Sequence, residues 1–77
     1  MPKIPIISGK QAIKAFQKIG YQIIRQRGSH IRLHHFSDST KTPLTVPNHK
    51  ALGKGLLRKL LRDAELTIDE FSRLLKK

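Results

Sequence analysis

The chain has 77 residues, which suffices for one small domain but not for a cofactor cleft between two lobes. It has no cysteine, which excludes disulfides, zinc–thiolate sites and a thiol nucleophile, and no apolar run approaches the roughly 20 residues of a membrane span. Sixteen lysines and arginines against five acidic residues give a net charge of +11, which points to a polyanionic partner. We therefore expect one domain over residues 1–77, located in the cytoplasm and without a membrane partner.

The first predicted helix spans residues 9–19. Ser8 and Gln11 have the spacing of a capping box, in which each side chain bonds a free backbone N–H of the first turn. Gly20 then favours the left-handed conformation that often ends a helix. Apolar residues recur behind the cap at helical spacing: Ala12, Ile13, Phe16 and Ile19.

Three short strands are predicted next, over residues 21–26, 29–36 and 44–46. The first is rich in aromatic and β-branched residues, and Arg27 and Gly28 mark the turn after it. Because the links between the strands are short, an antiparallel meander is the simplest arrangement.

The second strand alternates between apolar and polar side chains. Ile31 and Leu33 fall on one face, and His30, Arg32 and His34 fall on the other. The first face should pack on the core, and the second should border a basic surface open to solvent.

Two helices are predicted at the C-terminal end. The first has a leucine-rich stripe with Lys54, Arg58 and Arg62 on the opposite side, and Thr67 with Glu70 forms the capping box of the second. The predicted class is thus α+β, with the order α-β-β-β-α-α. Helices on one face of a three-stranded antiparallel sheet make a two-layer sandwich.

Histidine is the residue type most able to carry chemistry here. His30, His34 and His49 form only a loose metal-binding pattern without a carboxylate, so we expect no metal and no cofactor. We interpret His34 and His35 as exposed polar residues of a nucleic-acid surface.

His30 has a different context, because it follows Gly28 and Ser29 at the start of a strand, among several arginines. Nearby cations favour a neutral imidazole, which can act as a general base. RNA supplies its own nucleophile, the 2′-OH, and arginines can stabilise the charge that develops on phosphorus. Simple hydrogen bonding of His30 to a phosphate is the alternative that these residues leave open.

Several short motifs follow one another in the order found in the HicA family, the toxins of HicA–HicB toxin–antitoxin pairs. Together with the length of the chain, they make the sequence resemble that family. The resemblance covers nearly the whole chain and is centred on Gly28-Ser29-His30. The motifs are Ser8-Gly9-Lys10, Gly20-Tyr21, Arg25-Gln26-Arg27-Gly28-Ser29-His30, Val46-Pro47-Asn48-His49, the run from Leu52 to Leu61, and Thr67-Ile68-Asp69-Glu70-Phe71.

The resemblance implies a fold similar to the double-stranded-RNA-binding domain and an endoribonuclease that cleaves mRNA. It implies that His30 is catalytic and that a HicB-type antitoxin covers the active site. The polar turn through residues 37–42 is longer than expected for the family, but it does not touch the motif.

Charge and position, together with the motif, predict the RNA contacts. They are Arg25, Arg27, Gly28, Ser29, Arg32, His49, Lys50, Lys54 and Arg58. A non-catalytic module that binds double-stranded RNA is the alternative function, and in that case the row Lys54, Arg58 and Arg62 would lie along phosphates.

Overall fold

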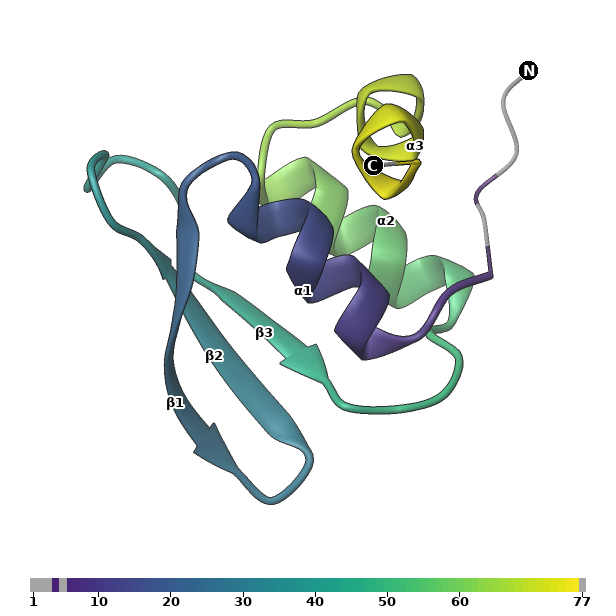
Figure 1. Cartoon of the computed structure of the whole chain (residues 1–77), viewed down its shortest axis with the longest axis horizontal. Helices are drawn as coiled ribbons and strands as arrows, with labels where there is room; N and C mark the ends of the chain where they lie inside the picture. The colour runs from purple at the N-terminus through teal and green to yellow at the C-terminus, as the bar shows by residue number, and fades with distance from the viewer. Residues whose placement is uncertain (1–3, 5, 77) are drawn as a thin grey trace.

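Six elements follow one another in the order α-β-β-β-α-α in the computed structural model, which describes residue 4 and residues 6–76 (Figure 1). This is the predicted α+β order. The elements are α1 (Gly9–Gln17), β1 (Tyr21–Arg27), β2 (His30–His35), β3 (Leu44–Pro47), α2 (Lys54–Asp63) and α3 (Ile68–Leu75).

The two predicted capping boxes are both formed. At the start of α1 the Ser8 hydroxyl accepts from the Gln11 N–H at 3.1 Å, and the Gln11 amide oxygen accepts from the Ser8 N–H at 2.9 Å. Thr67 and Glu70 repeat this exchange at α3, and hydrogen bonds from Thr67 lower the pKa of the Glu70 carboxyl. α1 ends at Gln17, two residues earlier than predicted.

The three strands form an antiparallel sheet in the order β1-β2-β3, which confirms the meander. In Figure 1 the helices lie together on one side of this sheet. Ile31 and Leu33 of β2 are buried toward the helices, whereas His30 and His34 are exposed. The sheet therefore has one covered face and one open face, as the alternation predicts.

Aromatic side chains occupy the centre of the core between the sheet and the helices. Phe16 of α1 contacts Tyr21 edge-on and packs against Phe71 of α3, with ring centroids 6.1 and 5.3 Å apart. The Tyr21 hydroxyl donates to the Thr42 carbonyl at 2.9 Å, and burial raises the pKa of this hydroxyl. The core thus fixes the start of β1 against α1. No helix among the described residues is both long enough and apolar enough to cross a membrane.

Gly20 closes the connection between α1 and β1 and cannot be replaced without strain. Its φ of 106° is disfavoured for residues with a Cβ, and a Cβ there would lie 2.4 Å from His35 Nε2. We expect Gly20→Ala to lower the free energy of unfolding by about 1–3 kcal/mol, measured by urea denaturation.

Gly55→Ala is the matched control, because Gly55 is exposed in α2 and a Cβ there meets no atom within 4 Å. It should stabilise the protein by up to about 1 kcal/mol through helix propensity. Equal effects of the two substitutions would contradict the role assigned to Gly20.

Candidate functional site

An irregularity in the β1–β2 pairing brings two arginines to the open face of the sheet. Strict alternation from buried Tyr21 would place Arg25 and Arg27 on the covered face. The register, however, pairs Ile23 with Leu33 and Arg25 with Arg32, so Ile24 is an extra residue in a β-bulge. Directly paired residues share a face, so Arg25 lies on the open face.

The bulge assembles a pocket on the open face, lined by Arg25, Arg27, His30, Arg32 and Thr45. Arg25, Arg32 and Thr45 form one row across the three strands, and Arg27 pairs with His30 in the next row. Four predicted site residues are therefore brought together, including His30. Sequence reasoning missed Thr45, and only the strand register could have revealed it.

Thr45 holds one of the arginines in place. Arg32 Nη1 donates to the Thr45 hydroxyl at 2.9 Å, across the β2–β3 pair. This bond fixes the guanidinium group at the side of the pocket and leaves its other N–H donors available to a ligand.

Positive charge dominates the pocket. Three arginines surround His30, and the two ion pairs among the described residues, Lys41–Glu65 and Lys59–Asp63, lie elsewhere. Like charges directly opposite one another, such as Arg25 and Arg32, destabilise a sheet. A bound phosphate would relieve this repulsion, because guanidinium groups match its geometry and charge.

Gly28 and Ser29 form the turn that presents His30. Gly28 has a left-handed φ of 56°, and its carbonyl accepts from the Gln26 side chain at 3.0 Å. The Ser29 carbonyl accepts from the Asn48 N–H at 2.6 Å, which ties the turn to the chain after β3. The predicted motif Gly28-Ser29-His30 thus lies at the rim of the pocket and has a defined backbone position.

His49 and Lys50 are exposed in the loop after β3, and neither lines the pocket. A backbone hydrogen bond anchors this loop: the His49 carbonyl accepts from the Gly9 N–H at 2.9 Å.

Lys54 and Arg58 are exposed on α2, one helical turn apart, and do not line the pocket either. α2 packs against the covered side of the sheet through Leu57, Leu60 and Leu61. The row that continues to Arg62 therefore belongs to a second basic surface, separate from the open face.

His34 is exposed, as predicted, and pairs with Gln22 on the open face. The same prediction is wrong for His35, which is half-buried. Its Nε2 lies 2.8 Å from the Ile19 carbonyl, and its Nδ1 accepts from the Asp38 N–H at 3.0 Å. These partners assign the neutral tautomer protonated at Nε2, so His35 fastens the end of β2 to the turn after α1.

The turn after β2 is ordered by its own polar groups. Asp38 accepts from the Thr40 hydroxyl at 2.6 Å and from the Thr40 N–H at 3.0 Å, which lowers the pKa of its carboxyl. Lys41 forms an ion pair with Glu65 at 3.0 Å, which raises the pKa of the Lys41 amine. The longer turn is thus tied to the body of the domain and lies beyond the pocket.

In the sequence, His30, His34 and His49 form a loose metal-binding pattern. Within the described ranges, no three histidine, aspartate or glutamate side chains are grouped as metal ligands would be. The three histidines are spread over the start of β2, its far end and the loop after β3.

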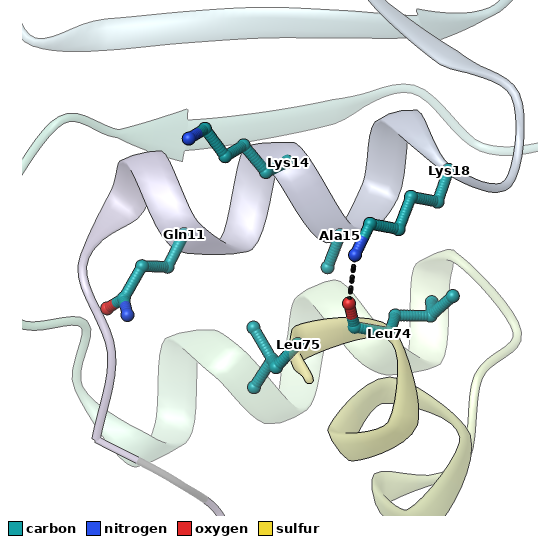
Figure 2. A pocket seen from close by; sticks show the side chains of 6 residues that line it. All are labelled: Gln11, Lys14, Ala15, Lys18, Leu74 and Leu75. Carbon is teal, nitrogen blue, oxygen red and sulfur yellow. Dashed lines mark hydrogen bonds between the residues drawn. The ribbon is translucent and has the colours of Figure 1, made fainter. Parts of the chain in front are cut away.

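A second pocket lies between α1 and α3 and is lined by Gln11, Lys14, Ala15, Lys18, Leu74 and Leu75 (Figure 2). Lys18 Nζ donates to the Leu74 carbonyl near the C-terminal end of α3. A cation at this helix end stabilises the helix and its packing on α1. None of the predicted site residues lines this pocket.

Comparison with protein families identifies a match over most of the chain. A search of curated proteins finds no relative. The family model described as the HicA toxin of bacterial toxin–antitoxin matches residues 9–66, which include the whole sheet, the pocket and α2. The match covers well over half of the chain and includes Gly28-Ser29-His30. The chain therefore belongs to the HicA toxin family of toxin–antitoxin systems.

Proposed function

We propose that this chain is a metal-independent endoribonuclease that cleaves mRNA, with His30 as its catalytic residue. HicA family toxins are mRNA-cleaving ribonucleases, which gives the reaction class. The observation that carries the proposal is the position of His30, exposed in a pocket with three arginines and a threonine hydroxyl. A cytoplasmic location accords with an mRNA substrate.

The proposed reaction needs only the RNA, these side chains and solvent, which supplies one proton and later receives the proton held by His30. His30 takes the proton of the 2′-OH, the 2′-oxygen forms a bond to phosphorus, and the bond from phosphorus to the 5′-oxygen breaks. The leaving 5′-oxygen takes a proton from solvent. The guanidinium groups stabilise the charge that develops on the phosphoryl oxygens. The products are a 2′,3′-cyclic phosphate and a 5′-hydroxyl.

The His34 imidazole does not reach the same phosphate as His30. His34 is four residues from His30 on β2, which is about 13 Å along the strand. Acid–base catalysis requires hydrogen-bond distances of about 3 Å. His34 is therefore assigned no step in the reaction, His49 does not line the pocket, and charge stabilisation by Arg25, Arg27 and Arg32 is assigned the remainder of the catalysis.

The predicted RNA contacts extend beyond the pocket. Gly28 and Ser29 border it through their backbone, and we assign His49 and Lys50, in the adjoining loop, to the neighbouring part of the RNA. The second basic surface, with Lys54 and Arg58, is separate from the pocket, so RNA bound along it need not reach His30. This separation favours the alternative function of a non-catalytic module for double-stranded RNA.

A protein partner completes the proposal. We expect a HicB-type antitoxin to cover the open face and to place a carboxylate among the arginines of the pocket. The net charge of +11 would accelerate association with an acidic partner.

Incubation of the purified protein with mRNA in excess EDTA tests the proposal. We expect cleavage at an unchanged rate and fragments that end in a 2′,3′-cyclic phosphate. Loss of cleavage on chelation, restored by a divalent ion, would contradict the metal-independent mechanism. RNA binding without cleavage, with or without EDTA, would favour the binding module.

A further inference from the structure

We propose that Phe36 forms a stacking site for an unpaired base of the bound RNA. The inference rests on the proposed function and adds to it a contact outside the cleavage pocket, on a residue that the sequence motifs do not include. Three observations support it: the exposure of the ring, the anchoring of its backbone, and its place directly after β2, the strand that begins at His30.

Phe36 differs from the other aromatic residues of the chain in its exposure. Phe16, Tyr21 and Phe71 are buried in the core, whereas Phe36 is 67% exposed. Leaving most of a phenyl ring in water forgoes the stabilisation that its burial would give. A ligand with a flat apolar face would recover part of that stabilisation.

The backbone of Phe36 is anchored, and one side of its ring lies against a neighbouring ring. The Phe36 N–H donates to the Gly20 carbonyl at 2.9 Å, which extends the β1–β2 hydrogen bonding beyond His35. The phenyl ring lies parallel to the His35 imidazole, with an interplanar angle of 5° and centroids 6.0 Å apart. Because both ring nitrogens of His35 are hydrogen-bonded, Phe36 packs beside a fixed neighbour.

The place of Phe36 directly after β2 suits an RNA that also occupies the pocket. Residues 30, 32 and 34 of β2 alternate with the buried Ile31 and Leu33, and the six residues of chain from His30 to Phe36 span at most about 20 Å. A single strand that crosses the pocket and follows β2 would therefore reach Phe36 with a base several nucleotides from the cleaved bond.

The charge of this surface favours RNA over a protein at Phe36. The β1–β2 hairpin that leads to Phe36 includes no acidic residue, and the carboxylate of Asp38, two residues after Phe36, is bonded to Thr40. An aromatic ring among polar and basic groups is the usual arrangement for base stacking, since the groove holds the backbone and the ring holds the base.

Exposed Ile23 of β1 does not belong to this surface, because it pairs with Leu33 and so projects toward the helix side.

A tryptophan at position 36 can report the contact directly, because the chain has no tryptophan. We would make Phe36→Trp in a His30→Ala background, so that a short single-stranded RNA stays intact, and follow tryptophan fluorescence during titration. The matched control is Ile6→Trp, at a residue that is 76% exposed in the segment before α1. A second titration uses an oligomer with the same backbone but abasic sugars.

We expect RNA to quench the fluorescence at position 36 but not at position 6, and the abasic oligomer to bind without quenching. Phe36→Ala should weaken RNA binding by roughly 5- to 150-fold, the range found for one stacked base. If the RNA binds by fluorescence anisotropy but neither quenching nor a loss of affinity appears, the stacking site is refuted while the pocket stands.

Two other results would also overturn the inference. If Phe36→Ala leaves RNA affinity unchanged but prevents co-purification of a co-expressed antitoxin, the ring is a protein contact instead. If the unmodified protein fails to bind RNA by anisotropy even at low salt, the proposed function fails, and the stacking site fails with it.

Discussion

Replacing His30 by alanine should lower the rate of RNA cleavage by a factor of about 10²–10⁴, the usual contribution of one general acid–base group. The affinity for RNA should change little, because the three arginines that line the pocket remain. The fold should also remain, since His30 is exposed and the Ser29–Asn48 hydrogen bond uses backbone atoms. The measurements are single-turnover cleavage at saturating RNA and binding by anisotropy.

His34→Ala is the matched control. It removes an exposed histidine from the same face of the same strand, but about 13 Å from His30, so the cleavage rate should stay within about twofold of the unmodified protein. If both substitutions lowered the cleavage rate equally, the histidines would act through a general electrostatic effect rather than through catalysis by His30. An active His30→Ala protein would remove the catalytic assignment altogether.

Periodicity and capping signals in the sequence predict most of the fold. Ser8 with Gln11 and Thr67 with Glu70 mark two helix starts, and both capping boxes are formed. The alternation of β2 correctly identifies its covered and open faces. Such features depend on residues near one another in the sequence, so the sequence alone can reveal them.

The features that the sequence could not predict depend on pairing between strands. The bulge at Ile24 decides which face Arg25 occupies, yet nothing in the run from Tyr21 to Arg27 indicates that one residue will be left unpaired. Thr45 reaches the pocket because β3 pairs with β2 in one particular register. His35 is hydrogen-bonded because the turn after α1 happens to lie beneath it.

The family resemblance selects His30 among four histidines, and the pairing of the strands explains what surrounds it. The motif places Arg27 directly before Gly28 and Arg25 three residues before it, but it does not show how they meet Arg32. The structure brings all three to the same pocket as His30, which the motif alone could not show.

Replacing Arg25 and Arg32 together by glutamine should move RNA binding and stability in opposite directions. Loss of two phosphate contacts should lower the salt dependence of binding, the slope of log K against log salt, by about 1.4 for a single strand. The maximal cleavage rate should fall as well, since these groups stabilise developing charge. Because the two arginines are directly opposite in the sheet, their removal should raise the free energy of unfolding by about 0.2–1 kcal/mol.

The double substitution Lys54→Gln and Arg58→Gln removes the same charge from the second basic surface on α2. If these residues contact only phosphates, RNA affinity and its salt slope should fall, but the cleavage rate at saturating RNA should not. That contrast separates the pocket, where charge acts on the reaction, from a surface that only holds the substrate. Should the α2 pair abolish binding while the pocket pair leaves binding and cleavage unchanged, the bound ligand would be a duplex along α2. The arginines around His30 would then need another explanation.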